Sequence, residues 1–196
     1  MATPMPASAS TPVAIRKFRS ESMPQCYEAN VNGLQRPELS IRPAELSDAI
    51  TVVEIFNHGV EDRVATFETE LATAEDATRW IERDVVIVGE RDGQVIGWAK
   101  ASPYTDQHPY YDGVREATLY VERGARRTGA GRQLLAALAD AAPEAGAHKL
   151  VGKIFTSNKP SIALVAGLGW REVGVHDRHG TLDGEWKDVL VVEKLL

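Results

Sequence analysis

The sequence predicts an α/β protein of the α+β kind, in which a mixed, mostly antiparallel sheet carries helices on both faces. Two apolar runs, Val85–Gly89 and Val95–Ala101, flank the tight turn Arg91–Gln94 and predict a hairpin. Segments 46–58 and 129–142 instead repeat apolar residues at helical spacing. Strands and helices do not alternate regularly along the chain, which argues against a doubly wound parallel fold.

The first 38 residues differ in composition from the rest of the chain. They contain five of the ten prolines, and Ala2–Pro12 consists almost wholly of small or turn-forming residues. Such a stretch buries too little apolar area to offset the entropy lost on ordering it. We therefore expect residues 1–38 to be a disordered and dispensable N-terminal extension, followed by one domain over residues 39–196.

The first part of this domain predicts a strand and two helices. Ser40–Pro43 predicts a short strand that ends at its proline. Apolar residues at helical spacing predict a helix over Leu46–His58, followed by a loop at Gly59–Glu70. A capping pattern at Thr73–Asp76 then predicts a second helix through Ile81.

The second part of the domain supplies the rest of the sheet. After the hairpin, the predicted elements are an irregular stretch at Ser102–Arg115, a strand at Ala117–Val121, a helix at Gly129–Ala142, a strand at Leu150–Phe155, a helix at Lys159–Leu168, and closing strands at Trp170–Val175 and Val189–Val192. A chain of 196 residues fits one such domain without structural metals or disulfides.

Bulk composition narrows the classes of partner. The single cysteine, Cys26, cannot form an internal disulfide or a cysteine-based metal cage. A net charge of −6 argues against nucleic acid, so any bound anion must be held by a local feature. The sequence has no apolar run near the ~20 residues of a membrane span, and its first residues lack the pattern of a signal peptide. We expect a cytoplasmic protein.

The most informative segment lies between the strand ending at Val121 and the helix that follows. There Gly129 and Gly131 are one residue apart, and the segment carries three arginines, which are Arg126, Arg127 and Arg132. Glycines let the backbone approach a ligand closely. Successive amides at a helix N-terminus form a cradle for anions. The pattern lacks the Gly-Lys-Ser/Thr of a P-loop and the third glycine of a dinucleotide fingerprint, because Leu134 occupies that position.

The segment Arg126–Gly131 resembles the Arg/Gln-x-x-Gly-x-Gly/Ala acyl-CoA motif of the GNAT superfamily of N-acetyltransferases, and the order of elements from Ile41 to Leu196 follows the same family. This resemblance implies the GNAT fold and acetyl-CoA as co-substrate, with no metal. It implies that the loop amides hold the pyrophosphate and that the preceding strand pairs with the pantetheine arm. The implied cofactor-binding residues are Leu119, Tyr120, Val121, Arg126, Arg127, Thr128, Gly129, Ala130, Gly131 and Arg132.

Several further segments resemble one branch, the phosphinothricin, methionine sulfoximine and arsinothricin N-acetyltransferases. These segments are 41–44, 57–62, 65–70, 116–121 and 184–189; Gly59–Glu70 together with Arg178–Gly184 most resembles the arsinothricin group. The resemblance implies a homodimer that acetylates the α-amino group of small glutamate-like analogues, a resistance or detoxification activity.

Carried over by position, Glu116 matches the glutamate that acts as general base, and Asn158 matches an asparagine that contacts coenzyme A. Base catalysis is needed because an amine at neutral pH must lose a proton before it attacks a thioester. Asn158 also precedes Pro160 and therefore predicts a helix start. Where many members have a tyrosine that serves as general acid, this chain has Val165, so we assign no general acid.

The expected substrate wall combines the loop after the first helix with the irregular stretch. Its candidate residues are Thr66, Phe67, Tyr104 and Arg115, and an arginine there would pair bidentately with an α-carboxylate. His176 and His179 lack a third ligand at fixed spacing, so we expect no metal site. Two alternatives stay open: acetylation of a protein or peptide amine, and a module that binds acetyl-CoA without turnover.

Overall fold

The computed structural model describes residues 38–104 and 108–196, which form a seven-stranded sheet in the order β1-β2-β3-β4-β5-β7-β6. All neighbouring strands pair antiparallel except β4 and β5, which are parallel. The predicted mixed sheet is therefore confirmed. The predicted extension falls on residues 1–38, of which 1–37 lie outside the described part.

The strands are β1 (Ser40–Pro43), β2 (Val85–Arg91), β3 (Gln94–Pro103), β4 (Val114–Val121), β5 (Lys149–Phe155), β6 (Arg171–Leu182) and β7 (Glu185–Leu195). The helices are α1 (Ala49–Glu61), α2 (Ala74–Arg83), α3 (Ala130–Ala141) and α4 (Lys159–Ala166), with short 3-10 turns at Leu46–Asp48, Pro109–Tyr111, Arg123–Ala125 and Ala142–Ala145. None of the helices in the described ranges combines the length and apolar character that crossing a bilayer requires.

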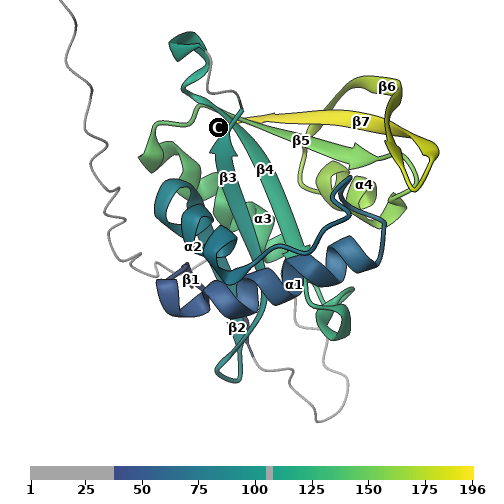
Figure 1. Cartoon of the computed structure of the whole chain (residues 1–196). Coiled ribbons are helices and arrows are strands. Elements are labelled where there is room, and N and C mark those ends of the chain that lie inside the picture. Colours follow the sequence, from purple (N-terminus) through teal and green to yellow (C-terminus); the bar gives the residue numbers. More distant parts are fainter. Residues whose placement is uncertain (1–37, 105–107) are drawn as a thin grey trace, which may run out of the picture.

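Two apolar clusters cover the two faces of the sheet, as Figure 1 shows for the helices. One cluster joins α1 and α2 to the sheet and includes Trp98, which is fully buried, and Tyr120. The other joins α3, α4 and the C-terminal strands, and includes Leu134 and Leu150. Alternate side chains of β4 enter opposite clusters, because successive residues of a strand point to opposite faces.

The sheet opens in its middle. β4 and β5 pair only through Val114–Glu116 and Lys149–Val151, and the two strands then diverge (Figure 1). Beyond Glu116, β4 keeps its partner β3 on one side, through Val121↔Gly97. On its other side, residues 117–121 have no strand partner among the described residues. This open edge positions the candidate site.

Most predicted local structure is confirmed. Thr73 accepts a hydrogen bond from the Asp76 amide and caps α2, and Asn158 caps α4 by accepting from the Ser161 amide. The hairpin turn places Asp92 and Gly93 at positive φ (52° and 75°), as a type I′ turn requires.

The closing strands were predicted too short. β6 and β7 reach residues 182 and 185 and meet at a second tight turn, with Asp183 and Gly184 at φ 51° and 82°. Nearly all of β6 is exposed, so it lacks the alternation of apolar and polar residues that marks a half-buried strand. The predicted irregular stretch is also shorter, because β3 runs to Pro103 and β4 starts at Val114.

Gly59 lets α1 pack closely against β4. A Cβ atom at this position would lie 2.4 Å from Cε1 of Tyr120, whose ring is held by Phe56 and Trp98. Alanine favours a helix over glycine by about 1 kcal/mol, but overpacking costs about 1–3 kcal/mol. We expect Gly59→Ala to lower the free energy of unfolding by about 1–2 kcal/mol in denaturant titrations. Gly174→Ala, where a Cβ meets nothing within 4 Å, is the control; equal stability of both variants would contradict this packing.

Candidate active site

A cavity of about 390 Å³ occupies the opening between β4 and β5. It passes between the two layers of helices, and its lining includes residues 116–120 of β4 and 152–155 of β5. Trp80 and Trp98 line the side of α1 and α2, whereas Leu164 and Trp170 line the opposite side. Its size lies within the roughly 300–1,000 Å³ typical of small-molecule sites.

Glu116 lies in this cavity as the last β4 residue paired with β5. Its Oε2 atom accepts a hydrogen bond from Nζ of Lys153, at 2.8 Å, and both side chains are about one-third exposed at 32% and 39%. Lys153 comes from β5, so the ion pair crosses the opening. A carboxylate that is solvated and paired on one oxygen keeps its other oxygen available to a ligand.

An aromatic wall closes the cavity below α1 and α2. Tyr120 and Trp80 both stack on Trp98, at centroid distances of 5.3 and 5.8 Å, and Phe56 meets Tyr120 edge to face. Burial raises the pKa of Tyr120 to about 12, although its hydrogen bond with Thr66 opposes the shift. The phenol is therefore protonated at neutral pH and offers a donor, not a base.

The loop after β4 has the geometry of an anion cradle. Arg127 and Gly129 adopt positive φ (62° and 90°), and Gly129 caps α3. In the described part of the chain, no backbone carbonyl accepts a hydrogen bond from the amides of residues 127–131. The Thr128 hydroxyl donates to the Ala125 carbonyl at 2.6 Å and fixes the turn. Ala130 and Gly131, the first residues of α3, complete five successive free donors at a helix N-terminus, which suits a phosphate.

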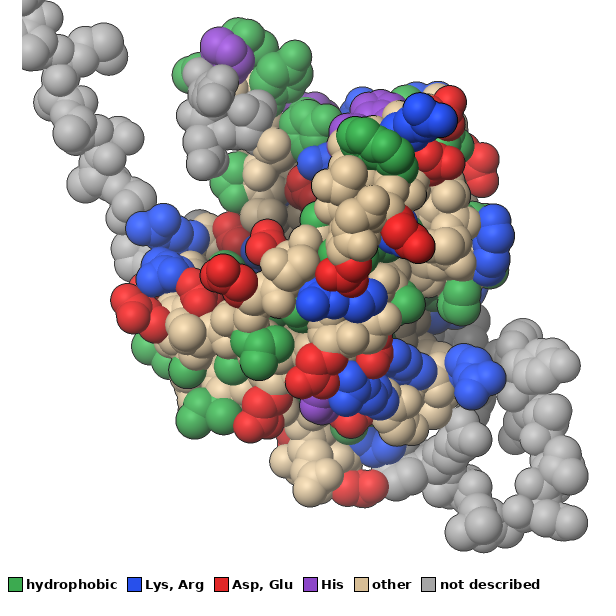
Figure 2. Space-filling model, turned by 45° about the vertical axis from the view of Figure 1, so that its right-hand side comes forward, with side chains coloured by type: hydrophobic (Ala, Val, Ile, Leu, Met, Phe, Trp, Pro, Cys, Tyr) green, Lys and Arg blue, Asp and Glu red, His purple; other side chains and the backbone are tan. Residues whose placement is uncertain are grey.

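Three of the four arginines in residues 123–132 hold the loop, whereas Arg127 is exposed and has no side-chain partner among the described residues. Arg126 donates to Asp62 at 2.7 Å and to the carbonyl of Val121 at 3.1 Å. Arg123 also donates to Asp62. Both arginines lower the pKa of the Asp62 carboxyl, and the hydrogen bond from Arg123 has the larger effect. Arg132 donates to the carbonyl of Gly167 at 2.9 Å and joins α3 to the end of α4. On the face in Figure 2, basic and acidic side chains are correspondingly interspersed.

The loop after α1 crosses the open end of the sheet. Arg63 pairs with Asp183 at 3.3 Å, and the Asn158 amide donates to the Val64 carbonyl at 3.2 Å. Phe67 packs edge to face on Phe155 at 4.7 Å. These contacts tie the loop to α4 and to the C-terminal strands, so Asn158 supports the loop as well as lining the cavity.

The structure brings five of the predicted site residues into one cavity. Glu116, Leu119, Tyr120, Asn158 and Thr66 all line the cavity. Phe67 does not; it supports the loop from behind, through its contact with Phe155. Tyr104 lies next to the Glu116 pair, with its ring 5.3 Å from Nζ of Lys153.

Arg115 is not placed with Glu116. It lines a separate cavity with Arg83 and Asp84, because neighbouring residues of β4 point to opposite faces of the sheet. Burial raises the pKa of the Asp84 carboxyl, and the nearby charge of Arg115 opposes this rise. Pairing of Arg115 with a substrate carboxylate in the main cavity therefore lacks geometric support.

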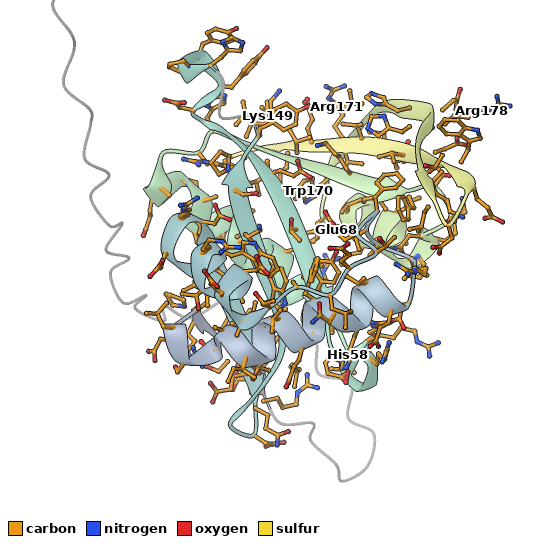
Figure 3. The ribbon with its side chains drawn as sticks, viewed as in Figure 1. His58, Glu68, Lys149, Trp170, Arg171 and Arg178 are labelled. Carbon is orange, nitrogen blue, oxygen red and sulfur yellow. The ribbon has the colours of Figure 1, made fainter. Side chains whose placement is uncertain are left out.

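The cavity side chains that were not predicted include Glu68, Lys100, Lys153 and Trp170. Figure 3 shows Glu68 and Trp170 in the region between β4 and β5/β7. Lys153 had a visible signal, because it interrupts the otherwise apolar strand Leu150–Phe155. Lys100 gave the same signal within Val95–Ala101. It lines the cavity while its Nζ pairs with Asp84 at 3.3 Å and lies over the ring of Trp80.

His176 and His179 approach each other on β6, with their Nδ1 atoms 3.2 Å apart. Within residues 38–104 and 108–196, no three His, Cys, Asp or Glu side chains gather closely enough to hold a metal ion.

The Glu116 carboxylate lies in the cavity of the divided sheet, and the amide cradle adjoins that cavity, because a Cβ atom at Gly131 would contact its lining residues Leu119 and Leu164. This arrangement suits a phosphate-bearing ligand beside an acid–base group. Residues 53–170 match the family model described as acetyltransferase (GNAT) family. The chain belongs to this family of acetyltransferases.

Relatives and solved structures agree with this assignment. The methionine sulfoximine/methionine sulfone acetyltransferase of Salmonella typhimurium is 29% identical over 79% of this chain and 93% of its own length. The phosphinothricin acetyltransferase of Sinorhizobium meliloti, solved with acetyl-CoA, has a TM-score of 0.75 and 27% identity, covering 81% and 88% of the two chains. The ribosomal-protein-alanine N-acetyltransferase of Brucella melitensis has a TM-score of 0.76 and 34% identity, covering 80% and 99%.

Gly131 tests the cradle. A Cβ atom there would contact Leu119, Val121 and Leu164 at 3.4–3.5 Å, so the larger branches of isoleucine would enter the opening beside the free amides. We expect Gly131→Ile to abolish acetyl-CoA binding in calorimetry while the circular dichroism spectrum stays unchanged. Gly124→Ala, in the same loop and with no atom near its Cβ, should bind normally. Unchanged affinity of a folded Gly131→Ile would show that this loop is only a turn.

Proposed function

We propose that this enzyme transfers the acetyl group of acetyl-CoA to the α-amino group of a small, glutamate-like amino acid analogue. The observation that carries the proposal is the position of Glu116. It lies where the free edge of β4 begins, and it lines the cavity together with residues 117–120 of that edge. The loop amides of residues 127–131 would hold the pyrophosphate, and the backbone of residues 119–121 would pair with the pantetheine arm. The acetyl-CoA complex of the Sinorhizobium relative supports acetyl-CoA as co-substrate.

In this proposal Glu116 is the general base. The free oxygen of its carboxylate takes a proton from the substrate ammonium, directly or through water, and the amine then attacks the thioester carbonyl. Thr66 and the protonated Tyr120 line the same cavity and offer donors to the substrate. Val165, on α4, lines the cavity but has no proton to give.

The dimensions and charges of the cavity support a small polar substrate. Lys100, Lys153, Thr66 and Ser161 place hydrogen-bond donors around it, and the loop after α1 covers its open end. The names of the Salmonella and Sinorhizobium relatives favour methionine sulfoximine or phosphinothricin. Arsinothricin is a third candidate because of the resemblance at Gly59–Glu70. Resistance to such compounds, a cytoplasmic location and a homodimer complete the proposal.

Acetylation of a protein amine is the second candidate. The Brucella ribosomal-protein-alanine N-acetyltransferase is 34% identical to this chain, which favours it. A peptide needs an open groove, however, and the loop from Arg63 to Glu70 is fastened across the opening by Asp183 and Asn158. A module that binds acetyl-CoA without turnover would have no need for the solvated, paired carboxylate of Glu116.

Glu116→Gln removes the proposed base and preserves the size of the side chain. We expect kcat to fall by about 10²–10⁴, with acetyl-CoA affinity nearly unchanged, as measured by thiol release and calorimetry. Glu172→Gln, on the exposed part of β6, is the matched control and should retain full turnover. Equal losses of turnover and of acetyl-CoA affinity would make Glu116 a structural residue instead.

The substrate class is tested by comparing kcat/KM for phosphinothricin, arsinothricin, methionine sulfoximine, glutamate and a lysine-containing peptide. We expect the three analogues with tetrahedral heads to react fastest. Glutamate should be poorer, because its planar carboxylate leaves donors arranged around a tetrahedral head unpaired. If the peptide reacted fastest and the analogues stayed at background, the small-substrate proposal would fail and the acetyltransferase assignment would stand.

A further inference from the structure

Lys153 is the one cation that contacts the proposed base in the described part of the chain. Its Nζ atom lies 2.8 Å from Oε2 of Glu116 and 5.3 Å from the ring centroid of Tyr104. It lines the cavity from β5, opposite the free edge of β4. A thioester lying along β4 within reach of Glu116 would therefore have this ammonium on its other side.

The reaction needs a group that stabilises the thiolate leaving group. A thiolate is a strong enough base, with an ordinary pKa of ~8.5, that its charge must be stabilised in a partly closed cavity. Val165, on the α4 wall, is apolar and cannot do so.

We propose that Lys153 stabilises the negative charge that develops on the coenzyme A sulfur as the thioester breaks. This inference rests on the proposed acetyl transfer. Glu116 neutralises Lys153 in the free enzyme, but it loses its charge when it takes the proton of the substrate ammonium. Lys153 is then left without its counterion at the stage when the thiolate forms. The Glu116 carboxylate thus loses its negative charge before the thiolate gains one, and Lys153 pairs with each in turn.

The substrate ammonium gives one proton to Glu116, and the nitrogen lone pair forms the C–N bond while the carbonyl π pair moves to oxygen. The oxygen pair then returns, and the C–S bond breaks with its electron pair passing to sulfur beside the Lys153 ammonium. The thiolate takes the second proton of the new amide nitrogen and leaves as thiol. Glu116 returns its proton to solvent, and Lys153 remains protonated throughout.

Lys100 does not fit this role, although it lines the same cavity. Its Nζ lies 3.3 Å from Asp84 and 5.0 Å over the ring of Trp80, on the side of α2. Asp84 takes no part in the proposed proton transfer, so the charge of Lys100 stays compensated throughout.

The test measures binding of the product thiol without turnover. Calorimetry compares coenzyme A with desulfo-coenzyme A at pH 6.5 and at pH 9.5, which lies between the ordinary pKa values of a thiol, ~8.5, and of lysine, ~10.4. Glu116→Gln imitates the protonated glutamate. In this variant the ratio of affinities for coenzyme A over desulfo-coenzyme A should rise at least about tenfold from pH 6.5 to pH 9.5, because the thiolate then forms beside an uncompensated Lys153. Glu116→Gln combined with Lys153→Met should show no rise, and combination with Lys153→Arg should restore it.

Lys149→Met is the matched control. Lys149 lies on the same strand (Figure 3) and pairs with Glu193 at 3.0 Å, outside the cavity. Combined with Glu116→Gln, it should leave the rise intact. In the wild-type background, Lys153→Met should lower kcat by about 10–10³-fold with little change in the KM for acetyl-CoA.

An equal rise with and without Lys153 would overturn the proposal, and affinity for desulfo-coenzyme A shows in each case that the variant is folded. Absence of amine acetylation by the wild-type enzyme would instead remove the proposed function, since the binding comparison involves no amine.

Discussion

The free edge of β4 is the constraint on which the rest of the site depends. Backbone amides and carbonyls in a protein interior need hydrogen-bond partners, yet β4 has no strand partner on this side beyond Glu116 within residues 38–104 and 108–196. A ligand that satisfies this edge must be extended and carry hydrogen-bonding groups along its length. The same divergence of β4 and β5 creates the cavity, brings Glu116 to its narrow end, and directs the end of β4 into the loop of free amides.

Side-chain contacts replace the missing strand pairing between the two parts of the sheet. Arg132 joins α3 to the end of α4 through the Gly167 carbonyl. On the other face, Asn158 holds the loop after α1 at Val64, and Phe67 packs on Phe155. These contacts span the opening at its two helical layers, so the cavity is enclosed without closing the edge of β4. The loop is thereby both a support of the fold and a wall of the site.

Charge is compensated locally around the site in a chain of net charge −6. Asp62 binds two loop arginines, Arg123 and Arg126, and thereby compensates their charges. Glu116 and Lys153 compensate one another across the opening. The second pair has a chemical consequence that the first lacks, because one of its members is the proposed proton acceptor and loses its charge during the reaction.

The sequence by itself determined most local elements, the class of fold and the glycine-containing loop before α3. Turn residues such as Asp92-Gly93, the Thr73 cap and the glycines at 129 and 131 act through neighbours a few residues away, so their effect is visible in the chain. The second half of the exposed strand β6, residues 176–182, escaped prediction because β6 buries no alternating face. Only the tertiary structure decided which distant side chains meet: it separated Arg115 from Glu116 by the alternation of β4, and it paired Glu116 with Lys153, 37 residues later. That pairing depends on how far two parallel strands run together before they diverge, which no local pattern encodes.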